Sequence, residues 1–180
     1  MTQTQGSQQS SMNEAVDINA GIMAGAEEDQ YLTFIMGDEE YGVDILRVQE
    51  IRGWDSVTPI PNTPAYIKGV INLRGTIVPI VDLRERFGMP QIHYGATTVV
   101  IVLKVVSDSS ERIMGVVVDA VSDVYNVAEE DMQPPPDFGS VVNIDYVKGL
   151  ATVTEKMIII LEIDQLMNSG ELAALSNSVR

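Results

Sequence analysis

Short runs of β-branched and apolar residues, separated by turn residues, follow a polar N-terminal stretch. Two of them, Val70–Leu73 and Ile77–Val81, flank an Arg74-Gly75 step, where glycine can take the positive φ of a tight reversal. This pattern predicts a β-hairpin, with either a two-residue turn or a longer loop that has a bulge at Gly75. Because Pro79 has no amide proton, its strand is expected at a sheet edge or at a bulge.

The same alternation of apolar and polar positions predicts further strands along the chain. Residues 46–51 fit either a helical turn or a strand. The strands are expected at 31–36, 41–45, 98–103, 113–118, 146–150 and 157–163.

Two short helices are expected among these strands. Asp82 can cap a helix that ends at Gly88, since an aspartate side chain accepts from the free amides of a first turn. A C-terminal helix through Leu175 is expected to begin at Asp164 or Ser169.

Composition sets the expected boundaries of the ordered part. Residues 1–29 are rich in Gln, Ser and Thr and poor in large apolar residues, so they are expected to form a disordered tail. Residues 30–175 are expected to form a single domain, followed by a frayed tail over 176–180.

An internal repeat relates the two halves of this domain. Gly42–Ile45 resembles Gly115–Val118, which lies 73 positions later, and Ile67–Val70 resembles Val147–Leu150, which lies 80 positions later. The repeat predicts two lobes, with approximate halves at 30–92 and 93–175 and the possibility of strand exchange. Short strands and frequent turns favour SH3-like barrels over a large sandwich.

Each lobe would have only about 60 residues, a size at which a separate core is marginal. We therefore expect the lobes to share a hydrophobic interface and to unfold together. Surplus apolar residues at positions 48, 51, 121 and 124 could supply it. A groove between two such lobes is a natural place for a ligand.

The charge of the chain narrows the classes of partner. Its 180 residues include 26 acidic and 11 basic ones, for a formal net charge of −15. Such a chain repels phosphate backbones and anionic lipid, so no nucleic acid is expected as a partner. No apolar run is long enough for membrane insertion, and no basic residue precedes Arg47 as in a secretory signal. The absence of cysteine fits a cytoplasmic protein.

No residue pattern indicates catalysis. His93 is the only histidine and has no matching nucleophile pattern, and the acidic pairs 39–40 and 129–131 lie in predicted turns. Neither a calcium loop nor a glycine-rich phosphate loop is present. We therefore expect no catalytic residue, no metal site and no cofactor.

Arg74 is the strongest candidate for a binding residue. An arginine at the tip of a rigid hairpin combines a bidentate donor with a packable stem, as interface hot spots do. The alternative is that Arg74 is only a polar turn residue. The equivalent turn of the second repeat has Thr154 and Glu155 in place of Arg74 and Gly75. An arginine needed only for the fold should be present in both turns. This difference favours binding.

Several of these segments together resemble the CheW family, adaptors that couple bacterial chemoreceptors to the histidine kinase CheA. The most specific are 37–46, 48–53, the hairpin around Arg74 and 115–124, and the resemblance spans 31–175. It implies a mainly β fold of two intertwined five-stranded SH3-like β-barrels with short helices and a C-terminal helix. It also implies a non-enzymatic cytoplasmic protein that is recruited to membrane-associated chemoreceptor arrays.

The resemblance further implies two docking surfaces. The regulatory domain of CheA would contact Ile45, Asp137 and Phe138. Gln133 stands where an arginine is expected, so this contact could lack an ionic component. The cytoplasmic tip of a chemoreceptor would dock in the groove between the lobes, against Val48, Glu50, Gly69, Arg74, Gly75, Val99, Val121 and Val124.

Other interpretations stay open at this point. The valines of this set could be pure core, and Gly69 could be needed only for its backbone conformation. The chain could also serve another receptor–kinase pathway. An acidic β-barrel hydrolase would need a convergent pair of carboxylates in the groove.

Overall fold

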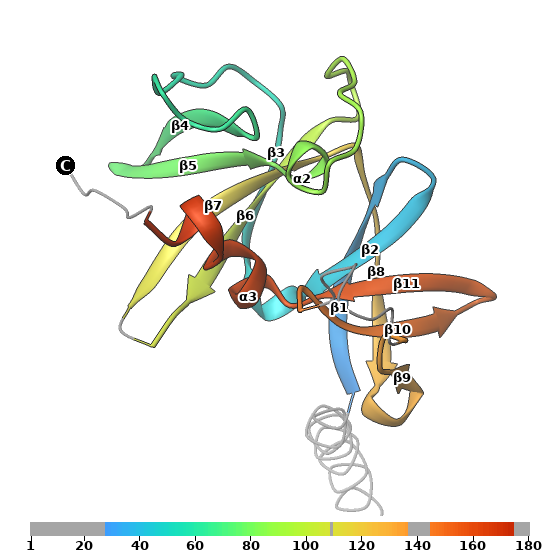
Figure 1. The fold of residues 1–180 in the computed structure, drawn as a ribbon. Helices are drawn as coiled ribbons and strands as arrows, with labels where there is room; N and C mark the ends of the chain where they lie inside the picture. Colours follow the sequence, from blue (N-terminus) through green and yellow to red (C-terminus); the bar gives the residue numbers. More distant parts are fainter. Residues whose placement is uncertain (1–27, 109, 137–144, 175–180) are drawn as a thin grey trace, which may run out of the picture.

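The computed structural model describes residues 28–108, 110–136 and 145–174. These residues form two β-sheets that lie side by side, with helices α2 and α3 at their junction (Figure 1). The six-stranded sheet contains, in spatial order, β8 (Ala120–Ala128), β1 (Glu28–Met36), β2 (Glu39–Asp44), β11 (Lys156–Leu161), β10 (Val147–Val153) and β9 (Met132–Gln133). The five-stranded sheet contains β3 (Val48–Gly53), β6 (Val99–Val106), β7 (Glu111–Val118), β5 (Thr76–Asp82) and β4 (Ile67–Leu73).

Short helices lie at the ends of these strands: η2 (Ile45–Arg47), α2 (Leu83–Arg86), η3 (Glu129–Asp131), α3 (Ile163–Met167) and η4 (Gly170–Ala174). The predicted mainly β class is confirmed. The predicted count of five strands per lobe is wrong for one sheet, because the two-residue strand β9 adds a sixth.

Each sheet combines strands from both repeats. The chain crosses between the sheets after β2 and again after β7, so β1 and β2 lie with β8 to β11, and β3 to β5 lie with β6 and β7. The two repeats are therefore intertwined.

The backbone shows the repeat directly. Register shifts occur between Ile67 and Gly69 in one copy and between Val147 and Gly149 in the other. Each sheet also has one parallel pair, β5 with β7 and β11 with β2, at equivalent places in the repeat.

The central strands are buried on both faces, which explains their continuous apolar runs. In β6, Ile101 and Leu103 face a large core that joins both sheets, whereas Val100 and Val102 face a smaller cluster inside the five-stranded sheet. We call the large cluster the shared core. Phe34 and Val43 of the six-stranded sheet belong to the shared core too.

The expectation that four surplus apolar positions supply the interface between the lobes is half right. Val48 and Val121 pack against the shared core. Ile51 and Val124 are 43% and 42% exposed, because each lies on an edge strand of its sheet.

The hairpin prediction is confirmed. Of the two places predicted for the strand of Pro79, the sheet edge is wrong, whereas a register shift does lie next to Pro79, where Ile80 and Val81 face Gly69 and Ile67. β4 and β5 are joined by the two-residue turn Arg74-Gly75, with φ of 52° and 90°. β5 is not an edge strand, since it lies between β4 and β7. Pro79 is tolerated there because the opposing Val70 bonds to Thr58 instead, and pairing with β7 begins only at Ile80.

The helix predictions differ in outcome. The Asp82 carboxylate accepts from the Glu85 amide at 3.1 Å and Gly88 takes a φ of 76°, as expected. α3 has no side-chain cap, and Asp164 lies within its first turn, where tertiary contacts engage its carboxylate. The Ser169 hydroxyl donates to the Leu166 carbonyl and accepts from Arg86, and the Leu172 amide of η4 donates to the Ser169 backbone carbonyl.

Some predictions concern residues outside the described ranges. These are most of the tail over 1–29, the tail over 176–180 and the end of the C-terminal helix at Leu175. The predicted boundary of the N-terminal tail is wrong by two residues, because Glu28 and Asp29 belong to β1, where they pair with Ala128 and Val127.

Gly69 occupies a place that no other residue fits. Its φ is +143°, and a Cβ atom there would lie 2.2 Å from the Thr58 carbonyl oxygen. We expect Gly69→Ala to lower the free energy of unfolding by about 2 kcal/mol or more, through backbone strain and a steric clash. Urea unfolding measures this, with Gly53→Ala as the matched control because a Cβ atom at Gly53 would have nothing within 4 Å. An unchanged midpoint in both variants would contradict it.

The shared core predicts one cooperative transition for both sheets. Met114 is fully buried in it, so Met114→Ala should cost about 2–5 kcal/mol through lost packing. Fluorescence from Trp54, in the five-stranded sheet's cluster, and far-UV circular dichroism should report the same midpoint in wild type and variant. Two separate transitions would show that the sheets unfold independently.

Candidate functional site

The edges of the five-stranded sheet approach each other. β3 and β4 are its two outermost strands, yet residues 50–52 of β3 and 72–74 at the end of β4 line one open pocket of about 420 Å³. A neighbouring pocket of about 280 Å³ is lined by residues 52–58, 70–72 and Val100. We call these two pockets the β3–β4 slot. Two backbone hydrogen bonds of 2.9 Å between Thr58 and Val70 lie beside the smaller pocket.

Arg74 projects from the turn at the larger pocket. The Asn72 side-chain oxygen accepts from the Gly75 amide at 2.8 Å and holds the turn. The Arg74 guanidinium lies 2.7 Å from a Glu50 carboxylate oxygen, and the two side chains are 75% and 27% exposed. The structure thus brings together Glu50, Arg74 and Gly75, three residues of the predicted receptor surface.

The turn itself does not require arginine. In the second repeat, Thr154 and Glu155 take φ values of 48° and 67°, close to the values of Arg74 and Gly75. An exposed ion pair such as that of Arg74 with Glu50 contributes at most about 1 kcal/mol to stability. The exposed guanidinium is therefore available for a partner.

Arg52 is a residue of this site that the sequence interpretation missed. Its Nε atom lies 3.8 Å from the other Glu50 carboxylate oxygen, so Glu50 stands between two guanidinium groups. The larger pocket consequently has two guanidinium groups against one carboxylate, a local excess of positive charge in a chain with a net charge of −15, and Asp55 lines only the smaller pocket. The spacing of Glu50 and Arg52, two positions apart in a strand, was the available signal, because such residues share a face.

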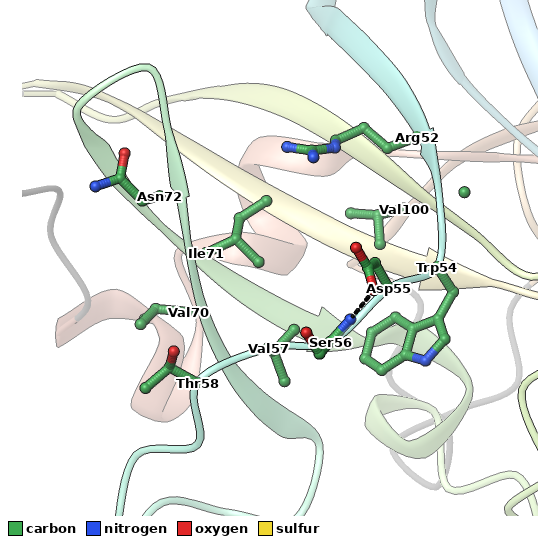
Figure 2. Close-up of a pocket in the computed structure, with 11 residues that line it drawn as sticks. Arg52, Trp54, Asp55, Ser56, Val57, Thr58, Val70, Ile71, Asn72 and Val100 are labelled. Atoms are coloured by element: carbon green, nitrogen blue, oxygen red, sulfur yellow. Dashed lines mark hydrogen bonds between the residues drawn. The ribbon is translucent and has the colours of Figure 1, made fainter.

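The smaller pocket has an apolar side and a polar side. Val57, Ile71 and Val100 line it together with Asp55 and Ser56, as Figure 2 shows. The Asp55 carboxylate accepts from the Ser56 amide at 2.8 Å.

Trp54 joins this pocket to the loop that follows α2. Its ring packs edge-on against Tyr94, with 4.4 Å between ring centroids. The Tyr94 hydroxyl donates to Asp82, and burial together with this hydrogen bond raises the pKa of Tyr94. The phenol stays protonated, so the hydrogen bond fastens the loop next to the slot.

The remaining residues of the predicted receptor surface lie elsewhere. Gly69 is buried beneath Thr58 and does not line the slot. Val48, Val99 and Val121 are partly buried against the shared core, whereas Val124 is exposed on β8 and so is not pure core.

Val48 connects the two groups of residues. It lies two positions before Glu50 in β3, and the pairing with β6 has a register shift between them, so that Val48 faces Leu103 and Glu50 faces Val102. β3 thus runs from the shared core to the slot.

The predicted kinase surface is only partly described. Ile45 begins η2 and packs against the shared core, while Asp137 and Phe138 lie outside the described residues. The adjacent Leu46 was missed and is 79% exposed. Its exposure follows from the helical turn at 45–47, which sequence alternation alone did not distinguish from a strand.

Other kinds of site are not formed by the described residues. Among them no group of three or more His, Cys, Asp or Glu side chains is arranged to hold a metal ion. Glu50 faces arginines, so it does not provide the carboxylate pair that a hydrolase would need. In the same ranges, every helix is too short or too polar to cross a bilayer.

Comparisons with known proteins agree with the fold. The family model described as "CheW-like domain" matches residues 30–171. A chemotaxis protein CheW of Klebsiella aerogenes is 48% identical over 158 residues, covering 88% of this chain and 91% of that protein. One from Rhizobium meliloti is 41% identical over 145 residues, covering 81% and 91%.

A solved structure shows the same architecture. The scaffolding protein TtCheW from Thermoanaerobacter tengcongensis superposes with a TM-score of 0.71 at 34% identity, covering 79% of this chain and 94% of that one. With the family model spanning both sheets and relatives of high identity along most of its length, this chain belongs to the CheW-like domain family.

Proposed function

We propose that this protein is a non-enzymatic chemotaxis adaptor that couples the cytoplasmic tips of chemoreceptors to the histidine kinase CheA. It would act in the cytoplasm and be recruited to membrane-associated receptor arrays. The observation that carries the proposal is the Arg74 side chain, 75% exposed on a turn whose equivalent in the second repeat forms without arginine. Membership of the CheW-like domain family supports it.

The slot has the chemistry to recognise a polar helical hairpin. Arg74 and Glu50 present a donor and an acceptor that already face each other, so little side-chain freedom is lost when a partner binds. Arg52 adds a second guanidinium beside them, and arginine forms bidentate hydrogen bonds with carboxylates. The receptor tip would extend from the slot along β3 towards Val48.

The kinase contact is proposed for a separate surface around η2. Ile45 is held against the shared core and Leu46 projects beside it, so the pair combines a fixed backbone with an exposed apolar side chain. Asp137 and Phe138 would contribute to a second kinase contact. Two separate surfaces would allow one molecule to bind receptor and kinase at the same time.

Arg74→Glu should weaken binding of a receptor tip fragment about 30-fold or more, as expected for loss of an interface hot spot. The thermal midpoint should change little, because the lost ion pair is exposed. Thr154→Glu, at the equivalent turn of the second repeat, is the matched control and should bind as the wild type does. Titration calorimetry with the fragment measures the affinities.

Equal affinities for Arg74→Glu and Thr154→Glu would overturn the role assigned to Arg74. Binding of receptor fragments from another receptor–kinase pathway, but not of chemotaxis receptors, would keep the adaptor function and change its pathway.

Leu46→Ala should weaken binding to the CheA regulatory domain without altering receptor binding or the urea midpoint, since Leu46 is 79% exposed. Met157→Ala is the control, because Met157 is also exposed but lies on β11. If Leu46→Ala and Met157→Ala both bind the kinase domain with the affinity of the wild type, the kinase surface lies elsewhere.

A further inference from the structure

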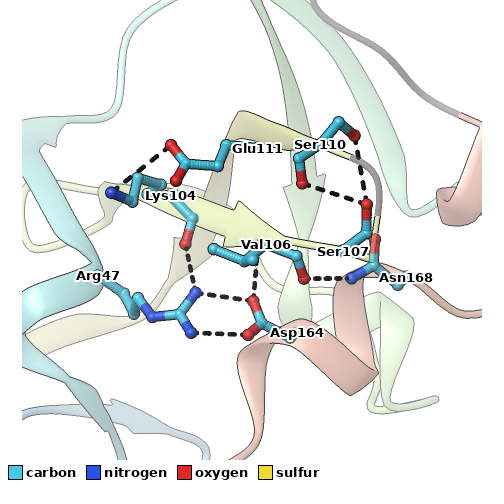
Figure 3. Close-up of polar contacts among 8 residues, drawn as sticks. All are labelled: Arg47, Lys104, Val106, Ser107, Ser110, Glu111, Asp164 and Asn168. Carbon is cyan, nitrogen blue, oxygen red and sulfur yellow. Dashed lines mark hydrogen bonds and ion pairs between the residues drawn. The ribbon is translucent and has the colours of Figure 1, made fainter.

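Two ion pairs fasten the two sheets to each other. In the first, Arg47 of η2 donates two hydrogen bonds of 2.8 and 2.7 Å to the Asp164 carboxylate of α3 (Figure 3). The same carboxylate accepts from the Val106 amide at the end of β6 at 2.8 Å. We call this group the Arg47–Asp164 clasp. It joins the helix after β11 of one sheet to β6 of the other.

The second ion pair has the same plan. Arg84 of α2 lies 2.9 Å from the Asp119 carboxylate, on the crossover between β7 and β8. That carboxylate accepts from the Gly37 amide, after β1, at 2.8 Å. We call this group the Arg84–Asp119 clasp. It joins the helix after β5 of the five-stranded sheet to the β1 end of the six-stranded sheet.

The internal repeat places the helix residues of the two clasps at equivalent positions and their partners one position apart. Arg84 and Asp164 are 80 positions apart, as Gly69 and Gly149 are. Asp119 lies 73 positions after Leu46, the residue next to Arg47, as Gly115 lies after Gly42.

The strand-end amides are equivalent as well. Thr33 pairs with Gly42, and Val102 pairs with the equivalent Gly115. Counting four residues on from Thr33 and from Val102 reaches Gly37 and Val106. The backbone amide donor is thus present in both clasps, whereas the charges are exchanged. The α-helix carries the aspartate in one clasp and the arginine in the other.

The exchange of charges has a consequence for assembly. If α2 docked at the position of α3, Arg84 would face Arg47 and the Val106 amide, two donors without an acceptor. If α3 docked at the position of α2, Asp164 would face Asp119. The side chains of both clasps are only 14–27% exposed, so like charges there are poorly screened.

The intertwined topology makes such misdocking a real alternative. The two repeats share the order of their five longer strands and of the α-helix that follows them, and each sheet already combines strands from both. A second copy of the chain could supply the exchanged elements, as in domain swapping. We propose that the exchange of charges between the two clasps, with an aspartate on α3 and an arginine on α2, determines which helix docks on which sheet. It thereby keeps the two repeats of one chain paired in a monomer.

The test places an arginine on the helix and an aspartate opposite it in both clasps, so that both ion pairs are kept. A triple variant carries Leu46→Asp, Arg47→Ala and Asp164→Arg, which copy the second clasp into the first at equivalent positions. A rescue variant adds Arg84→Asp, Asp119→Leu and Ala120→Arg to these three substitutions. The two helices then again have opposite charges, with the aspartate on α2 and the arginine on α3. A double variant with Arg47→Ala and Asp164→Ala removes one clasp without equalising the charges.

Each full-length chain is refolded from urea over a range of concentrations and analysed by size-exclusion chromatography with light scattering. The triple variant should show a ratio of dimeric to monomeric molecules about tenfold or more above the wild type, because unlike charges replace like ones in the misdocked state. The rescue variant should return to the wild-type ratio. The double variant should remain a monomer with reduced stability.

The proposal is wrong if the triple variant refolds to the wild-type ratio of dimer to monomer. It is also wrong if the triple variant aggregates or dimerises and the rescue variant behaves no better. The readout is the assembly state of the protein alone, so it is independent of the proposed adaptor function.

Discussion

The rest of the structure depends on the core between the two sheets. Each sheet has only a small cluster of its own, whereas the shared core collects residues from both sheets and from α2 and α3. A lobe of about 60 residues buries too little surface to fold well alone, so the shared core compensates for a size limit. The two crossovers and the two clasps surround this core and fix how the sheets meet.

The candidate binding surface is a by-product of sheet curvature. The two edge strands of the five-stranded sheet approach each other, and Gly69 lets the segment containing Thr58 pack against β4. The larger pocket between the edges is lined by one carboxylate and two guanidinium groups, whose ion pairs are largely exposed and add little to stability. Stability comes from the core, whereas the recognition proposed for this protein comes from the slot, so changes in one can leave the other intact.

Comparison of the two repeats separates what the backbone needs from what the side chains add. Both hairpin turns have two residues with similar positive φ values, but only one has an arginine. Both clasps use a strand-end amide and an ion pair, but the charges are exchanged. A fold built from a repeat must distinguish its own halves, and side-chain charge is where the two halves differ most clearly.

The sequence by itself determined the local elements and the family. Alternation and turn residues located the hairpin at Arg74 and the helix cap at Asp82, because φ preferences and capping depend on near neighbours. The offsets of 73 and 80 positions predicted the repeat before the sheets were known.

Only the tertiary structure decided which strands are neighbours and which distant charges meet. Pro79 lies in a central strand, Asp164 binds Arg47 instead of capping a helix, and Arg74 pairs with Glu50. Each of these facts depends on strand order and on how the sheets pack. Local periodicity states which face a residue is on, but not what lies opposite that face.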